Sequence, residues 1–163
     1  MSLHRLFLTF FGSGLSPKAP GTAGSFAALI IGICILYTLG ADTLFMLTLA
    51  ITIIAIFEIN KYESATNSHD NSEIVIDEVS GMWISILIVN SVLTNVDNFI
   101  IILLGYILSF VFFRIFDIYK PSTIGWIDRE VNGGLGVMGD DVLAGIASGF
   151  LVGLIIVALE KII

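Results

Sequence analysis

Two pairs of adjacent carboxylates are the residues of this 163-residue chain whose spacing most directly suggests chemistry. Asp77-Glu78 immediately precedes an apolar run, and Asp140-Asp141 immediately precedes another. Carboxylate oxygens are suitable ligands for a hard cation such as Mg²⁺. Each pair also has a structural explanation, because acidic residues in the first turn of a helix complement its dipole. Two such pairs, both near basic residues, favour a magnesium site, provided that the two helices pack side by side.

Basic residues that could hold a phosphate group lie in the segment 114–121. Asp117 is three residues from Arg114 and three from Lys120, so a continuous helix would place all three side chains on one face. An acid flanked by two bases suits phosphate binding beside a metal. The same spacing would also fit a structural ion-pair ladder in which Arg114 extends toward the membrane surface.

A segment rich in glycine and hydroxyl residues, 12–25, precedes the first apolar run. Glycine allows a ligand to approach the backbone closely, and free N–H groups at a helix start favour anions. Phosphate oxygens could therefore be bound by the hydroxyls of Ser13, Thr22 and Ser25 and by the Lys18 ammonium. The segment lacks the spacing of a Walker P-loop. The alternative is a flexible lead-in to the helix, with Ser25 as its N-cap.

The composition indicates that a membrane protein carries these residues. Apolar residues make up 56% of the chain and charged residues only 13%, against about 25% charged residues in a typical soluble domain. A very apolar soluble bundle fits these values less well. The net charge of -7 disfavours a nucleic-acid partner, and one cysteine, Cys34, excludes a disulfide framework and a cysteine-ligated zinc site.

Five apolar segments predict an all-α, polytopic membrane bundle of about five spans, within a single domain covering residues 1–163. Several segments are shorter than the roughly 20 residues that a crossing helix needs, so flanking residues must join them or the bilayer must thin. The first and third could instead be re-entrant. The N-terminal stretch Met1–Phe11 is expected to form an interfacial helix. The five segments are Phe26–Leu39, Thr43–Phe57, Val79–Leu93, Phe99–Phe113 and Val142–Leu159.

The distribution of charge predicts the orientation of the bundle. Six of the seven Lys and Arg residues fall on the side of the long connections, and only Lys161 falls on the other side. The positive-inside rule then places this polar side and the N-terminus in the cytoplasm, with the C-terminus outside. The span interiors hold almost no ionisable residues. This disfavours the non-enzymatic alternative, a small membrane transporter or ion-binding protein.

Four motifs occur in order along the chain: Gly12-Ser13-Gly14…Pro20-Gly21-Thr22, Asp77-Glu78…Gly81, Phe116-Asp117…Lys120-Pro121, and Gly133-Gly134-Leu135-Gly136-Val137-Met138…Asp140-Asp141…Ala144-Gly145. With these motifs the chain resembles the phosphatidylglycerophosphatase A family over nearly its whole length. It departs from the family at Pro121-Ser122-Thr123-Ile124, which lacks a second proline, and at His69-Asp70, which Asn71 follows in place of proline. Both departures affect loops more than the reaction. The signature of CDP-alcohol phosphatidyltransferases, another class of membrane enzyme with paired carboxylates, is missing.

The resemblance implies a bacterial inner-membrane enzyme, with its active site facing the cytoplasm, that needs Mg²⁺. It would hydrolyse the terminal phosphomonoester of phosphatidylglycerophosphate, a membrane phospholipid, to phosphatidylglycerol and phosphate. Since no Asp-x-Asp nucleophile motif is present, a metal-activated water is the preferred nucleophile. Asp117 could position this water, act as a base or bind the metal. The expected metal ligands are Asp77, Glu78, Asp140 and Asp141, the expected catalytic residues are Asp117 and Lys120, and the expected substrate-binding residues are Ser13, Lys18, Thr22, Ser25 and Arg114.

Overall fold

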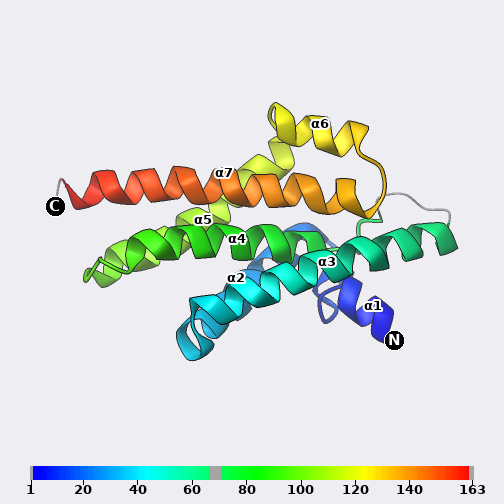
Figure 1. The fold of residues 1–163 in the computed structure, drawn as a ribbon, viewed down its shortest axis with the longest axis horizontal. Coiled ribbons are helices and arrows are strands. Elements are labelled where there is room, and N and C mark those ends of the chain that lie inside the picture. The colour runs from blue at the N-terminus through cyan, green and yellow to red at the C-terminus, as the bar shows by residue number, and fades with distance from the viewer. Residues whose placement is uncertain (1, 67–70, 162–163) are drawn as a thin grey trace.

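The computed structural model describes residues 2–66 and 71–161, and every regular element in these ranges is a helix (Figure 1). The predicted all-α bundle is therefore confirmed. His69 and Asp70, which the sequence placed in a loop, lie outside the described residues. The elements are α1 (Leu3–Leu8), a 3₁₀ helix η1 (Ser13–Leu15), α2 (Pro20–Leu39), α3 (Ala41–Thr66), α4 (Ile76–Leu93), α5 (Phe99–Tyr119), α6 (Thr123–Glu130) and α7 (Gly134–Glu160).

Among the described residues, five helices are long and apolar enough to cross a membrane: α2, α3, α4, α5 and α7. Each is longer than the apolar run that predicted it, and most of the added residues lie at the polar end. The first run, for example, is extended by the six residues from Pro20 to Ser25. An apolar run marks only the lipid-immersed part of a helix, whereas backbone hydrogen bonding continues into polar sequence. Helices α2 and α4, which correspond to the two runs that could have been re-entrant, are continuous helices of 20 and 18 residues.

Helix α4 occupies the centre of the bundle, and most of its residues are buried. Its closest neighbour is α7, because small residues let the two backbones meet. A Cβ atom on Gly145 would overlap the backbone oxygen of Gly81, and one on Gly149 would lie 2.7 Å from the Cβ of Ile88. The side-by-side packing of these two helices, which a shared metal site requires, is therefore present. Ala147, a further small residue of α7, is only partly buried and lines a groove beside α5 and α6.

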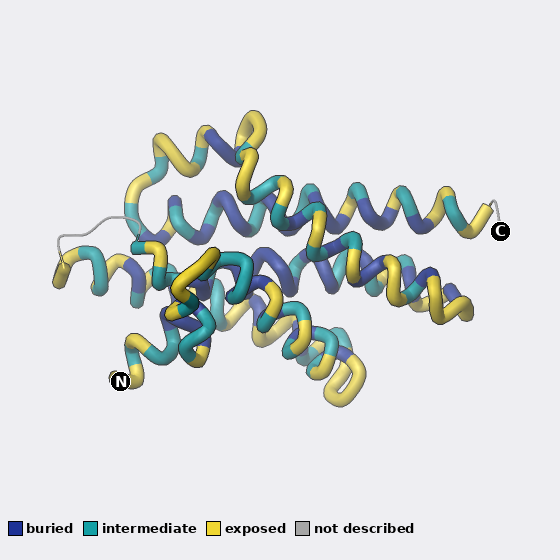
Figure 2. Tube along the Cα trace, turned by 180° about the vertical axis from the view of Figure 1, so that it is seen from behind, coloured by how far each residue is buried: buried dark blue, intermediate teal, exposed yellow. Residues whose placement is uncertain are grey.

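The outer surface of the bundle suits contact with lipid. Figure 2 shows buried residues along the inner faces of α4 and α7, and exposed residues around the hairpin of α2 and α3. Many exposed residues on α2, α3 and α5 are large and apolar, including Phe26, Phe45 and Leu103. Cys34 is also exposed on α2, away from any polar cluster. These features agree with a membrane protein, and among the described residues the buried carboxylates, Glu78, Asp140 and Asp141, all lie at one end of the bundle.

Short polar contacts join the first helices to the rest. The ring of His4 on α1 is hydrogen-bonded to the Glu58 carboxylate on α3 and stacks on Tyr62, with the ring centroids 6.0 Å apart. The indole Nε1 of Trp83 on α4 donates to the carbonyl of Ala28 on α2 at 2.8 Å. The His4 contacts hold α1 against α3, and the Trp83 hydrogen bond holds α2 against α4.

Candidate active site

All the polar helix ends meet at one end of the bundle. Helices α2, α4 and α7 begin there, α3 and α5 end there, and α6 lies beside them (Figure 1). A pocket of about 340 Å³ opens between these ends. Six residues named from the sequence line it, and they come from the ends of α4, α5 and α7: Asp77, Glu78, Asp117, Lys120, Asp140 and Asp141.

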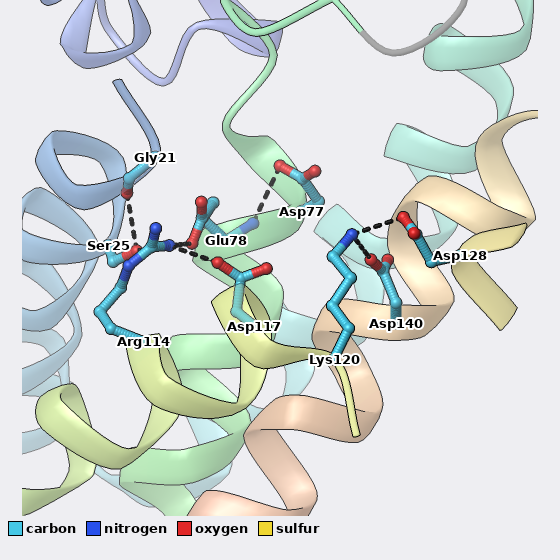
Figure 3. A network of polar contacts seen from close by, with 9 residues as sticks. All are labelled: Gly21, Ser25, Asp77, Glu78, Arg114, Asp117, Lys120, Asp128 and Asp140. Atoms are coloured by element: carbon cyan, nitrogen blue, oxygen red, sulfur yellow. Dashed lines mark hydrogen bonds and ion pairs between the residues drawn. The ribbon is translucent and has the colours of Figure 1, made fainter. Parts of the chain in front are cut away.

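One side of the pocket is organised by Arg114 of α5. Its guanidinium forms ion pairs with Glu78 of α4 and, at 2.8 Å, with Asp117 one turn further along α5. It also donates to the hydroxyl of Ser25 at 3.1 Å. That hydroxyl lies 2.6 Å from Glu78 Oε2 and 2.7 Å from the carbonyl of Gly21, so it can donate to either. Helices α2, α4 and α5 are therefore joined by one buried polar network (Figure 3).

Ser25 lies within α2, whose first residue is Pro20. The alternative in which Ser25 caps this helix is therefore wrong. Likewise α7 begins at Gly134, so Asp140 and Asp141 lie in its second turn, and the glycine-rich stretch before them belongs to the helix. Asp77 and Glu78 do lie in the first turn of α4, and Asp77 accepts a hydrogen bond from the Glu78 amide at 3.0 Å. For this pair, the role at the helix start and a role in the pocket are compatible.

Three carboxylates in the pocket have the arrangement of a cation site. One oxygen each from Glu78, Asp117 and Asp141 lie within 4.8 Å of one another, the only such group among the described residues. Asp141 is 3% exposed, and its Oδ1 has no hydrogen-bond partner in the described part of the chain. Buried carboxylates without a partner are costly. The donor set is all oxygen, which fits a hard cation such as Mg²⁺. Asp77 and Asp140 line the pocket but fall outside this group of three.

The other side of the pocket holds Lys120, whose ammonium bridges two helices. Its Nζ atom lies 2.5 Å from Asp128 Oδ1 on α6 and 2.6 Å from Asp140 Oδ2 on α7 (Figure 3). Partial burial lowers the pKa of Lys120, but the hydrogen bonds and charges of these two carboxylates outweigh it, and its pKa lies above the ordinary value. The ammonium therefore stays charged at neutral pH. The pairing of Lys120 with Asp117, which the alternative of an ion-pair ladder requires, is not observed.

Three residues predicted to bind substrate lie elsewhere. Ser13 donates its hydroxyl to the backbone carbonyl of Phe10 at 2.9 Å. Lys18 is exposed, and neither it nor Thr22 is among the residues that line the pocket. Of the glycine-rich segment 12–25, the residues that line the pocket are Pro20 and Gly21. The closest approach of α2 is at Gly21, where a Cβ atom would overlap the carboxylate of Glu78.

Asp128 was missed by the sequence analysis. It follows Pro121 in a connection that carries four charged residues within eleven positions, and nothing in that pattern distinguishes one acid from another. The signal that could have found it is the helical periodicity of α6, in which Ile124 and Asp128 are one turn apart and share a face. Ile124 is buried, and Asp128 lies on the same side of α6, where it lines the rim of the pocket with its side chain 38% exposed.

Comparison with known proteins agrees with this picture. Residues 6–156 match the family described as phosphatidylglycerophosphatase A. Phosphatidylglycerophosphatase A of Escherichia coli (strain K12) is 40% identical over 139 residues, which is 85% of this chain and 74% of that protein. A protein from Bacteroides thetaiotaomicron with the provisional name phosphatidylinositol-3-phosphatase is 40% identical over 149 residues, or 88% of this chain and 87% of that protein.

A third relative, phosphatidylglycerophosphatase A of Haemophilus influenzae, is 35% identical over 136 residues, covering 83% of this chain and 78% of that protein. No solved structure matches the chain. All four motifs that carried the resemblance lie within the matched range. On this extent of similarity, the chain is a phosphatase that belongs to the phosphatidylglycerophosphatase A family.

Proposed function

We propose that this protein hydrolyses the terminal phosphomonoester of phosphatidylglycerophosphate in a magnesium-dependent reaction. The observation that carries the proposal is the group of three carboxylates, Glu78, Asp117 and Asp141, with a fixed guanidinium on one side and a fixed ammonium on the other. Six carboxylates line the pocket or its rim, against two basic side chains. A phosphate dianion would be repelled by this excess of negative charge unless a cation accompanied it.

The residues present fit such a cation. Glu78, Asp117 and Asp141 would hold it, and Asp77 and Asp140, which line the same pocket, would bind it through water, as is common for Mg²⁺. Bound there, the ion would offset the charge of the phosphate and of the carboxylates and make the phosphorus more electrophilic. Phosphoryl transfer depends mainly on such electrostatic stabilisation and on positioning.

The basic residues would orient the phosphate group. Lys120 can donate a hydrogen bond to a phosphate oxygen, because an ammonium has three donors and its two carboxylate partners use two of them. Arg114 keeps Glu78 and Asp117 at a fixed separation, and the absence of a side chain at Gly21 makes room for the Glu78 carboxylate. Asp77 faces the pocket outside both ion-paired groups, so we assign it to the attacking water, whose proton it would accept.

The position of the pocket suits a lipid substrate. Its carboxylates lie within the first or last two turns of α4, α5 and α7, which is about 10 Å or less from the helix ends. A phosphate at this depth can remain covalently linked to acyl chains that lie in the bilayer. The excess of basic residues at the same end supports an orientation toward the cytoplasm of the bacterial inner membrane.

A second substrate is suggested by the Bacteroides thetaiotaomicron relative. Phosphatidylinositol 3-phosphate also has a phosphomonoester on a membrane-anchored headgroup, and the names of the Escherichia coli and Bacteroides thetaiotaomicron relatives give different substrates. The pocket chemistry described above serves either ester. The assay must therefore compare both lipids.

The test is release of phosphate from each lipid by the detergent-purified protein, with Mg²⁺ or with a chelator. We expect faster release from phosphatidylglycerophosphate, dependence on Mg²⁺, and a fall of roughly 100-fold or more in Asp141→Asn, since even indirect ligand partners are worth 10–100-fold. Asp97→Asn is the matched control, because Asp97 is an exposed acid at the opposite end of the bundle. No release from folded wild type with any divalent ion would overturn the proposal and favour a binding or transport role.

A further inference from the structure

A tight corner between α5 and α6 brings Asp128 back to Lys120. Lys120 ends α5 in the left-handed conformation, with φ 43°, and Ser122 also has a positive φ of 50°. Gly125 lies against this corner, where a Cβ atom would overlap the carbonyl oxygen of Lys120. The chain therefore reverses within a few residues, and α6 returns along the rim of the pocket (Figures 1 and 3).

Helix α6 is held in place by packing that does not involve Asp128. Ile124 is 6% exposed, and Ile127 packs so closely on α7 that a Cβ atom at Gly139 would lie 3.1 Å from it. Apolar contacts of this kind fix the orientation of a short helix. The carboxylate of Asp128 is thus presented to the pocket by a scaffold that would remain if its charge were removed.

The ammonium of Lys120 needs such a partner. A lysine side chain is flexible, and the backbone of this one has left the helix, so the spacing rules that orient helical side chains no longer apply to it. Asp140 alone would restrain it from one side, at 2.6 Å. With Asp128 on the other side, at 2.5 Å, two of its three N–H donors are assigned and the direction of the third is determined.

We propose that Asp128 is a positioning residue, which fixes the ammonium of Lys120 so that its remaining N–H donor meets the phosphate group of the substrate. This inference rests on the proposed function and assigns a role to a residue of α6 within it. Asp128 would act through Lys120 and would not itself contact the phosphorus or the metal. The arrangement supplies one fixed cationic donor opposite Arg114, on the far side of the carboxylate group.

The experiment is a double-mutant cycle with Asp128→Asn and Lys120→Met. For each protein, kcat/KM for lipid phosphate release and the Kd of inorganic phosphate with Mg²⁺ present are measured, the latter by isothermal titration calorimetry. We expect Asp128→Asn to lower kcat/KM about 10-fold or more, as loss of a charged hydrogen bond does, and to weaken phosphate binding. The double variant should be no worse than Lys120→Met alone, because coupled residues are not additive.

Two controls separate positioning from folding. Glu130→Gln makes the same change of charge on the exposed side of α6 and should leave both measurements unchanged. Asp128→Glu keeps the charge and should recover much of the activity lost in Asp128→Asn, with similar thermal unfolding in all of them. Equal activity of Asp128→Asn and Glu130→Gln, or additive effects in the cycle, would overturn the inference. If wild type releases no phosphate, the proposed function fails, and the phosphate Kd values still decide whether Asp128 acts through Lys120.

Discussion

Replacing single glycines along α7 should damage the protein in a graded way that depends on how closely α4 approaches each position. At Gly145 a methyl group would overlap the backbone oxygen of Gly81, and neither helix has a flexible atom there that can move aside. At Gly149 the nearest atom would be the Cβ of Ile88, at 2.7 Å. At Gly153 the nearest atom would be a methyl group of Val92, at 3.4 Å, an ordinary van der Waals contact.

The expected magnitudes follow from these distances. Overpacking a close helix contact costs about 1–3 kcal/mol, and Gly145→Ala should lie at the upper end because two backbones must separate. Alanine is about 1 kcal/mol better than glycine within a helix, so Gly153→Ala should be neutral or slightly stabilising. Gly149→Ala should fall between the two. For a chain of this length each kcal/mol corresponds to about 2–4 °C in Tm.

Activity should separate Gly145 from Gly149 more clearly than stability does. Asp141 lies one turn before Gly145, about 6 Å along α7, so a shift of α7 at Gly145 also moves Asp141 away from Glu78 on α4. A misplacement of about 1 Å in an active site can reduce the rate about 100-fold. Gly149 is two turns from Asp141, and its replacement should reduce activity much less.

The assay is thermal unfolding in detergent together with kcat/KM for phosphate release, for the three alanine variants and wild type. The reasoning is refuted if Gly145→Ala has the stability and activity of Gly153→Ala. It is also refuted if the order of the three variants does not follow the distances.

Two further substitutions test the contacts that join the helices. Arg114→Lys keeps the charge, but an ammonium cannot bond Glu78 and Asp117 through one planar group. We therefore expect kcat/KM to fall about 10- to 100-fold. Wild-type activity of this variant would mean that only the charge of Arg114 matters. Trp83→Phe removes the hydrogen bond to the Ala28 carbonyl and should cost about 1 kcal/mol, seen as a lower Tm with little change in kcat/KM; an unchanged Tm would show that this bond contributes nothing.

The arrangement of the spans could be predicted from their order along the chain. Successive spans run in opposite directions, so the starts of the first, third and fifth spans and the ends of the second and fourth must lie on one side. That rule alone puts Asp77, Glu78, Asp117, Asp140 and Asp141 at one end of the bundle. The pairing of Arg114 with Asp117 was equally local, since both lie in α5 one turn apart.

The residues at which the helices begin could not be predicted, because a glycine can serve either to let two backbones approach closely or to make the chain flexible. The glycine-rich stretch before Asp140 lay outside the apolar run Val142–Leu159, yet α7 begins at Gly134. A Cβ atom at Gly134 would overlap the carbonyl of Ile56 on α3, and one at Gly136 would overlap the carbonyl of Val131. These glycines are present because backbones approach each other there. From sequence alone, a glycine required for contact looks the same as a glycine required for flexibility.

Lys120 shows that a spacing of three residues predicts a shared face only within a helix. Its spacing of three residues from Asp117 predicts a shared face, and the prediction holds only while both residues are helical. Helix α5 ends at Tyr119, and the left-handed conformation of Lys120 turns its side chain from Asp117 toward α6 and α7. The partners of Lys120 are then determined by where those two helices lie. The contacts of a residue at the end of a helix therefore depend on the packing of neighbouring helices as much as on its own helix. The partners of a catalytic residue at such a position cannot be predicted from a local sequence pattern.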